Sequence, residues 1–208
     1  MPRTPRSPET VDIFRQNILD AALNIIVESG FESLSMRKLA AKLDITATTL
    51  YNYYMSKDDL YFYIRMHGFE LLYDCLDRAC ASHDRPLDRI RAAVEAYLRF
   101  GFQNMDYYEV MFLSRSVPKF LDCVGTPLEE VARREKNISI QPLFLVAEKL
   151  AELPDSYGSD PRYQAVRLWT ELNGIVSLHN SRLLREVEDD VEGLVSRLAS
   201  DICERFVE

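Results

Sequence analysis

The sequence predicts an all-α protein made of a small N-terminal domain and a larger helical domain. The chain has 208 residues, 47% of them apolar, which is enough to form a buried core in each of two such domains. It contains only seven glycines and no alternating runs of Val, Ile and Thr, the pattern of half-buried strands. Charged and apolar residues interleave with helical spacing almost throughout, so we expect helices and no sheet.

Composition also limits the function classes. No run of about 18 apolar residues exists and the start carries no apolar stretch, so we expect a cytoplasmic protein with no membrane partner. The four cysteines form no CxxC pair and no histidine has metal-ligand spacing, so we expect reduced thiols, no metal and no cofactor. A redox-sensing cysteine, with Cys123 as the candidate, is the alternative. The chain has no Gly-rich phosphate loop, GxSxG or HExxH motif, so we predict no catalytic residue and no enzyme.

Helix signals divide the first domain, which we place at residues 10–56 after a disordered, Pro-rich arm at residues 1–9. The first helix is expected from Thr10 to Ser29, ending before Gly30, with a buried face of Ile18, Ala22, Ile25 and Ile26. A second helix follows the N-cap Ser35 and runs to about residue 43. Its buried side comprises Met36, Leu39, Ala40 and Leu43.

A third, short helix begins at the N-cap Thr46, after a tight turn at Asp44 and Ile45, and ends at residue 53 or 54. Two short helices joined this tightly form a helix-turn-helix. On a helical wheel, the face around Leu50 that packs on the first two helices also carries Ala47, Tyr54, Thr46 and Tyr53. The opposite face carries Thr48, Thr49, Tyr51 and Asn52.

This outward face fits the major groove of double-stranded DNA. Asn can bond adenine edges, Thr methyl groups can meet thymine methyl groups, and hydroxyls can hold phosphates. Arg37 and Lys57 start the helices on either side and would add positive charge. Residues 1–57 carry seven Lys or Arg against six Asp or Glu, whereas residues 58–208 carry eighteen against twenty-seven. The acidic excess therefore lies outside the first domain, which suits a DNA-binding head on an acidic body.

Residues 57–208 are expected to form the larger helical domain. A capping box at residues 56–59 starts its first helix. Helices are predicted over residues 57–82, 86–105, 127–153 with a kink at Pro142, 162–186 and 189–207, with short helical pieces over 107–115, an irregular stretch over 116–126 and a loop over 154–161. The last two are amphipathic, and such helices often pair with copies of themselves, so we expect a homodimer through them. Their stripes are Leu168, Leu172, Ile175, Val176, His179 and Leu183, and Val191, Leu194, Val195, Leu198, Ile202 and Phe206.

The head resembles that of the TetR-family transcriptional regulators over roughly residues 14–62. The matching elements, at fixed spacing, are Ala21-Ala22, Gly30-Phe31, Ser35-Met36-Arg37, Leu39-Ala40, Thr49-Leu50-Tyr51 and Ser56-Lys57-Asp58-Asp59-Leu60. The resemblance implies DNA contacts at Arg37, Thr48, Thr49, Tyr51, Asn52, Tyr53 and Lys57, and we add the N-cap Thr46 to these candidates. Asp44 stands where the family usually has Gly, and Thr48 where a small residue is common.

The body is similar to the family more loosely, in residues 104–112 and in Trp169 with Asn173-Gly174, where Asn173 replaces a histidine of one subgroup. The resemblance implies a small-molecule effector in the body and a four-helix dimer bundle. An aromatic cluster of Tyr97, Phe100, Phe102, Tyr107, Tyr108, Phe112, Phe120, Phe144 and Trp169 suits either a core or an apolar pocket. As effector contacts we predict Tyr97, Phe100, Met105, Phe112, Trp169 and Asn173.

The function that these features predict is a DNA-binding transcriptional regulator. It would bind a palindromic operator as a homodimer, with half-sites about one DNA turn or a multiple apart, and act as a repressor released by an unknown effector. A dimeric activator or a redox-responsive regulator of the same fold is the alternative. A dimerising module without DNA binding is disfavoured by the outward face of Thr48, Thr49, Tyr51 and Asn52.

Overall fold

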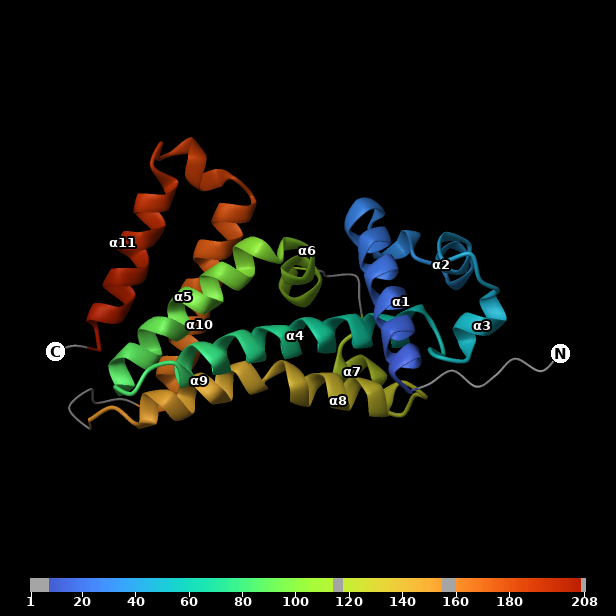
Figure 1. Cartoon of the computed structure of the whole chain (residues 1–208), viewed down its shortest axis with the longest axis horizontal. Helices are drawn as coiled ribbons and strands as arrows, with labels where there is room; N and C mark the ends of the chain where they lie inside the picture. Colours follow the sequence, from blue (N-terminus) through green and yellow to red (C-terminus); the bar gives the residue numbers. More distant parts are fainter. Residues whose placement is uncertain (1–7, 114–117, 155–159, 207–208) are drawn as a thin grey trace. The chain divides into compact units, whose positions relative to one another are not determined.

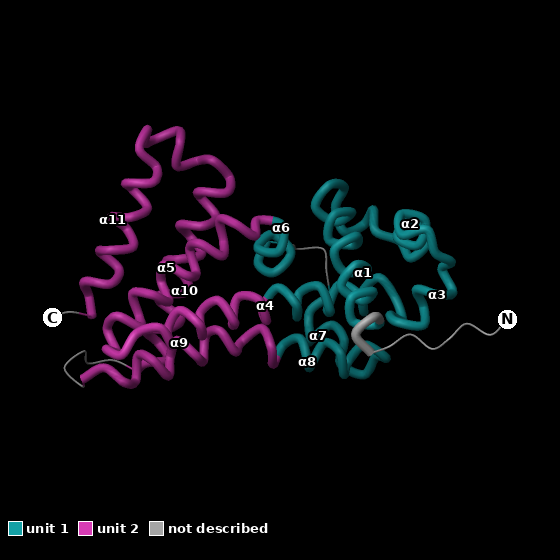
Figure 2. Tube along the Cα trace, in the orientation of Figure 1, with its two compact units in different colours: residues 1–68, 106–136 teal, residues 69–105, 137–208 magenta. Residues whose placement is uncertain are grey.

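The computed structural model describes residues 8–113, 118–154 and 160–206, and over these ranges it contains helices, turns and loops but no strand, which confirms the all-α prediction. None of the helices described is both long enough and apolar enough to cross a membrane. The chain divides into two compact units, residues 1–68 with 106–136 and residues 69–105 with 137–208 (Figure 2). Helix α4 (Lys57–Ala81) contributes its first part to one unit and its remainder to the other.

The first unit contains the three predicted N-terminal helices (Figure 1). Helix α1 (Pro8–Ser29) begins two residues before the predicted start, so Pro8 and Glu9 are helical and not part of a disordered arm. Residues 1–7 of that arm lie outside the described residues. Helix α1 ends at Gly30, whose φ of 80° lies in the region that favours glycine. Helices α2 (Met36–Lys42) and α3 (Ala47–Tyr51) follow, and α3 is shorter than predicted.

Side-chain caps and one left-handed residue set the joint between α2 and α3. The Ser35 hydroxyl accepts a hydrogen bond from the Lys38 N–H (3.2 Å), and the Thr46 hydroxyl accepts one from the Thr49 N–H (3.1 Å), as predicted for N-caps. Asp44 has a φ of 53°, a conformation that Asp tolerates better than most residues. The chain therefore makes the tight turn without the glycine that is usual in the family.

One apolar cluster forms the core of this unit. Its members come from α1, α2, α3, the start of α4 and the segment after α5, and include Ile18, Ala22, Ile25, Leu39, Leu50, Leu60, Ile64 and Val110. The Tyr61 hydroxyl donates to the Val110 carbonyl (2.8 Å). Arg65 on α4 and Glu135 on α8 (Glu129–Ser139) form a buried ion pair at 3.0 Å. Burial raises the pKa of the Glu135 carboxyl, and the Arg65 charge partly opposes this shift.

Short pieces of helix connect the long ones. Helix α6 (Met105–Tyr108) and a π-helical turn (Glu109–Leu113) agree with the short pieces predicted over 107–115, of which residues 114–115 lie outside the described residues. Helix α7 (Phe120–Cys123) lies in the stretch expected to be irregular, and of that stretch residues 116–117 are not described. The prediction was wrong at α7 because four residues are too few to show helical periodicity.

The second unit consists of the later part of α4 with α5 (Pro86–Gln103), α9 (Gln141–Ala151), α10 (Pro161–Asn180) and α11 (Val191–Glu204). Helices α5 and α10 touch backbone to side chain at Gly101, where an added Cβ would lie 2.6 Å from a Val176 methyl. The Asn180 amide donates to the Gly101 carbonyl (3.0 Å) at the same place. This close approach sets the spacing of the two helices (Figure 1).

Two predicted helices differ in extent from those observed. The helix expected over 127–153 is two helices, α8 and α9, which separate at Ile140 because Pro142 lies in the first turn of α9, where its missing N–H costs nothing. Helix α10 ends at Asn180, six residues before the expected end, and Arg182 then adopts a φ of 64°. Leu183, predicted to be buried, is 54% exposed. No glycine or proline marks this end, so the apolar spacing alone extended the helix too far.

Helix α11 is tied to α10 by an ion pair at its C-terminal end. The Arg205 guanidinium donates to both carboxylate oxygens of Glu171, with one nitrogen–oxygen distance of 2.6 Å. The hydrogen bonds from Arg205 are the main cause that lowers the pKa of Glu171 below its ordinary value of 4.5. The charge of Arg205 and a hydrogen bond from Arg167 lower this pKa further. The charged carboxylate is therefore the form that stabilises the fold.

We expect Glu171→Gln to lower the free energy of unfolding by about 1 kcal/mol at neutral pH, because two charge-assisted hydrogen bonds on a partly exposed pair are lost. Since the folded-state pKa is depressed, the stabilisation is fully present above pH 4.5 and is lost as the pH falls through the folded-state value. Denaturant titrations of both proteins across this range should show the difference shrinking on acidification. Glu186→Gln, at an exposed carboxylate, is the control. An undiminished difference in acid would contradict this account.

Candidate DNA-binding surface and interior pocket

Helix α3 presents a polar, uncharged surface on one side and one apolar anchor on the other. Leu50 is fully buried in the core of the first unit. Thr48 and Asn52 are exposed, Tyr51 is 54% exposed and Thr49 is half-buried. The predicted outward face is thus accessible, and nothing charged interrupts it.

Thr46 and Tyr53, both predicted on the inward side of α3, differ in their exposure to solvent. Thr46 is exposed, contrary to its predicted inward orientation, because its hydroxyl points along the helix start to cap Thr49 and also lies 2.9 Å from the Thr49 hydroxyl. Tyr53 is half-buried, and its ring packs edge-on against Phe14 of α1 with centroids 5.2 Å apart. The ring position of Tyr53 is therefore fixed by α1.

Lys57, at the start of α4, is held by two neighbours from the segment after α1. Its ammonium group lies 3.2 Å from a Glu32 carboxylate oxygen and 4.5 Å from the centre of the Phe31 ring. The Glu32 side chain is 76% exposed, so this carboxylate competes with any other anion for Lys57. Arg37 is exposed in the first turn of α2.

The cap at the start of α4 is a variant of the predicted capping box. The Asp59 N–H donates to the Ser56 hydroxyl (3.0 Å), and the Asp59 carboxylate accepts from the Met55 N–H (2.7 Å) in place of Ser56. Burial raises the pKa of the Asp59 carboxyl, and the Met55 hydrogen bond opposes the shift. These bonds connect the end of the α3 segment to α4.

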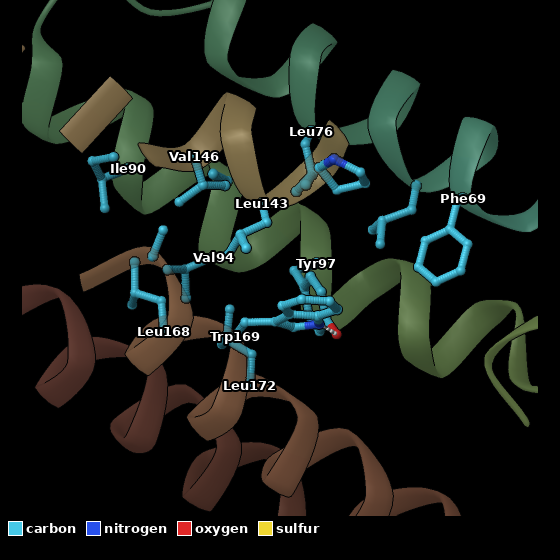
Figure 3. A pocket seen from close by; sticks show the side chains of 14 residues that line it. Phe69, Leu76, Ile90, Val94, Tyr97, Leu143, Val146, Leu168, Trp169 and Leu172 are labelled. Carbon is cyan, nitrogen blue, oxygen red and sulfur yellow. Dashed lines mark hydrogen bonds between the residues drawn. The ribbon is translucent and has the colours of Figure 1, made fainter. Parts of the chain in front are cut away.

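The second unit contains an apolar pocket between its helices (Figure 3). Its walls come from the later part of α4 and from α5, α9 and α10. The lining side chains are Phe69, Leu72, Leu76, Ile90, Ala93, Val94, Tyr97, Pro142, Leu143, Val146, Ala165, Leu168, Trp169 and Leu172. None of them is charged, so the pocket suits an apolar molecule.

The two polar groups of this lining bond to each other. The Trp169 indole N–H donates to the Tyr97 hydroxyl (3.1 Å), and Figure 3 shows the two side chains side by side between α5 and α10. Asn173, one turn further along α10, donates to the Trp169 carbonyl (3.0 Å). The bond fixes the indole ring, and the indole N–H needs no partner from a bound molecule.

The pocket brings together two of the six predicted effector contacts, Tyr97 and Trp169. Phe100 is buried but lines a different hollow between the end of α4 and α5, and Met105 is 53% exposed. Asn173 bonds the α10 backbone, and Phe112 belongs to the first unit, where its ring lies 4.8 Å from that of Tyr108.

Sequence reasoning assigned most of the pocket to the core. Leu168 and Leu172 were placed on an amphipathic helix stripe, and Leu143 and Val146 were not singled out. Apolar side chains at helical spacing give the same pattern whether they touch each other or surround a cavity, so no signal in the sequence distinguishes the two.

The cysteines are free, and three of them, Cys80, Cys123 and Cys203, are buried. Burial raises the pKa of each of these three thiols, which reduces the thiolate needed for oxidation. Cys75 is half-buried. In the described part of the chain no three His, Cys, Asp or Glu side chains are grouped so as to hold a metal ion.

Two family models match the chain. Residues 18–64 match the bacterial regulatory proteins of the tetR family, and residues 90–202 match the tetracyclin repressor-like C-terminal domain. The HTH-type transcriptional repressor KstR of Mycolicibacterium smegmatis is 30% identical over 125 residues, which are 58% of this chain and 61% of KstR. An HTH-type transcriptional regulator of Mycobacterium tuberculosis, itself uncharacterised, is 24% identical over 89% of this chain and 80% of its own length.

A solved structure shares the fold along most of both chains. The transcriptional regulator FadR from Bacillus subtilis, in complex with stearoyl-CoA, superimposes with a TM-score of 0.70 at 15% identity and covers 90% of this chain and 97% of its own. Because the C-terminal family model alone spans more than half of the sequence, and the N-terminal model covers the helix-turn-helix, the chain belongs to the TetR family of bacterial transcriptional regulators.

Proposed function

We propose that this regulator is a repressor that binds a palindromic operator as a homodimer and is released by an apolar small-molecule effector. In this proposal residues 10–56 are the DNA-binding domain and residues 57–208 bind the effector and form the dimer. The observation that carries the proposal is the exposed, uncharged face of α3. Leu50 on the opposite side of α3 is fully buried, and both α2 and α3 have side-chain N-caps.

The contacts of this face with DNA follow from its chemistry. Asn52 is suited to an adenine edge, the Thr48 and Thr49 methyl groups to thymine methyls, and the Tyr51 ring and hydroxyl to base or phosphate. Arg37, Lys57, Thr46 and Tyr53 lie at the margins of the same helix pair and are proposed as phosphate contacts. The head is near neutral in charge, so specific contacts must supply a large share of its affinity.

The effector is proposed to occupy the interior pocket. Fourteen uncharged side chains line it, and the polar atoms of Trp169 and Tyr97 are bonded to each other, so an apolar group enters without stripping water from a charge. Tyr97 and Trp169 are the proposed contacts that the sequence had already indicated. The structural neighbour FadR binds stearoyl-CoA, a ligand with a long apolar chain, which agrees with this assignment.

The dimer is proposed to form through α10 and α11. Leu178 on the outer side of α10 is 43% exposed, and Leu183 and Val187 in the following turn are 54% and 78% exposed. Gly174, one turn before Leu178, has no atom near the position of a Cβ, which allows a helix of a second copy to approach closely. Exposed apolar side chains beside such a site are typical of helix pairing.

Selection of bound fragments from random duplex DNA tests the operator proposal. The wild-type protein should enrich a palindromic motif, and Asn52→Ala should weaken binding to that motif by about 1–3 kcal/mol while leaving binding to unrelated DNA almost unchanged. Tyr51→Ala should weaken it by about tenfold. Asn137→Ala, at an exposed asparagine of α8, is the matched control. Failure to enrich any motif at low or moderate salt would contradict the proposal.

Removing the Glu32 carboxylate should strengthen operator binding. Because Glu32 holds Lys57 at 3.2 Å, Glu32→Gln leaves Lys57 available to a phosphate, and we expect affinity about twofold to fivefold higher at low salt and a smaller gain at high salt. Fluorescence anisotropy with labelled operator measures both.

Glu28→Gln removes the same charge from the exposed end of α1 without touching Lys57 and serves as the control. The gain should disappear when Lys57 is replaced by Ala in the same chain. An equal gain in the Lys57→Ala background would show that Glu32 acts by general charge alone.

The dimer proposal is tested by one charge on the outer face of α10. Sedimentation velocity should show a dimer for the wild-type protein and a folded monomer for Leu178→Arg, since a charge buried in an apolar interface has no partner. Leu121→Arg, at a leucine of α7 that is 81% exposed, should remain dimeric. A dimer that survives Leu178→Arg and Leu183→Arg together would place the interface elsewhere.

A further inference from the structure

One side chain, Leu143 on α9, lies in the walls of both the interior pocket and a hollow on the surface of the same unit. Among the described residues it is the one that lines both. The hollow lies where α9 faces the start of α10, and its other apolar walls are Ile140, Phe144, Tyr163 and Val166. Phe144, Tyr163 and Val166 are 41%, 61% and 46% exposed, so these apolar surfaces are accessible from solvent. Movement of the Leu143 side chain would therefore open a path between the interior pocket and the surface hollow.

The interior pocket has no place for a charged group. The polar atoms of its lining side chains, the Trp169 indole N–H and the Tyr97 hydroxyl, bond to each other at 3.1 Å. A carboxylate or phosphate inside would lose its hydration and gain no ion pair in return. Any effector with such a group must keep it outside the pocket.

The hollow outside Leu143 offers the missing positive charge. The Arg162 guanidinium lies 5.1 Å from the centre of the Phe144 ring. The Asp160 carboxylate also lines the hollow, and it caps α10 by accepting a hydrogen bond from the Arg162 backbone N–H (2.9 Å). A planar guanidinium held over a ring presents paired N–H donors, which match the oxygens of a carboxylate or phosphate.

From this arrangement we propose that the effector site has an outer subsite, and that the effector is an elongated amphiphile with one anionic end. The subsite is formed by Ile140, Leu143, Phe144, Asp160, Arg162, Tyr163 and Val166. Its apolar body lies in the interior pocket, it passes Leu143, and its anionic end binds Arg162. The inference rests on the proposed effector pocket and adds the class of ligand, the path of entry and the residue that controls it.

The outer subsite is separate from the proposed dimer face. Leu178 lies twelve residues beyond Val166 on α10, about 18 Å along the helix axis. Because a second copy of the chain could also cover an exposed apolar hollow, the oligomeric state of the Arg162→Gln variant is measured as well.

The test uses the full-length protein without DNA and the emission of Trp169, the single tryptophan of the chain. The probes are octanoate, decanoate, dodecanoate and tetradecanoate, with the alcohols of the same lengths. We expect affinity to rise about fourfold for each added methylene that becomes buried, and the alkanoate to bind more tightly than the alcohol. Arg162→Gln should remove the alkanoate's advantage and leave the alcohol unchanged. Arg197→Gln on α11, at an arginine with a 72% exposed side chain, is the control.

The entry route is tested by the rates of the same emission change after rapid mixing. Leu143→Ala should raise both association and dissociation rates several-fold, and Leu143→Phe should lower both, because the side chain at this position must move before a chain can pass. Leu121→Ala, at the exposed leucine of α7, should change neither rate. A purely structural role for Leu143 would change stability without moving the two rates together.

Several outcomes would overturn the proposal. One is no response of Trp169 to any probe. Another is equal loss of alkanoate and alcohol binding in Arg162→Gln, and another is unchanged rates in both Leu143 variants. The last is dissociation of the dimer by Arg162→Gln, which would make the hollow an interface between copies. If the probes bind as expected but leave operator binding unchanged, the subsite stands and the proposed release from DNA fails.

Discussion

The DNA-binding surface depends on the burial of Leu50. Helix α3 has five residues, far fewer than an isolated helix needs in water, so its conformation must come from its surroundings. Leu50 is fully enclosed by α1, α2 and the start of α4, and Thr46 caps the N-terminus of α3. With these two constraints in place, Thr48, Tyr51 and Asn52 have only one direction left, toward solvent. The polar face is thus a consequence of one apolar anchor and one cap, and the chain uses no charge on α3 itself to position it.

In contrast to the polar face of α3, the pocket of the second unit is lined almost entirely by apolar side chains. Its helices leave space between α4, α5, α9 and α10, and in this space the Trp169 indole N–H donates to the Tyr97 hydroxyl. An apolar cavity with satisfied polar groups is selective by exclusion, because a charged molecule pays for desolvation and receives nothing. Because the pocket excludes charged groups, an anionic end of a ligand needs a site outside it. Leu143 lies in the walls of both the pocket and the outer hollow, and Arg162 supplies a positive charge in that hollow. The proposed ligand class and entry route rest on this property of the lining.

Local chemistry was sufficient to predict much of the fold. Gly30 ends α1, Ser35 and Thr46 cap α2 and α3, and Asp44 takes the left-handed conformation in the joint, because each of these depends on neighbouring residues only. The end of α10 at Asn180 was less predictable, since apolar spacing continues through it and tertiary packing decides where the helix stops. Pro142 indicated a kink, and the structure has a full break between two helices at Ile140. The pocket was predicted only through Tyr97 and Trp169. Leu143 could not be distinguished from core, because whether a leucine faces another side chain or a cavity is set by helices distant in sequence.

The central claim is that binding of an effector in the apolar pocket and binding of operator DNA to the same protein weaken each other. Binding linkage is reciprocal, so the affinity of dodecanoate, followed by Trp169 emission, should be measured with and without a saturating operator duplex. The account predicts that the duplex weakens dodecanoate binding by the same factor by which dodecanoate weakens binding of the duplex, on the order of fivefold to 150-fold. Equal dodecanoate affinity for the free and the operator-bound protein would contradict the account.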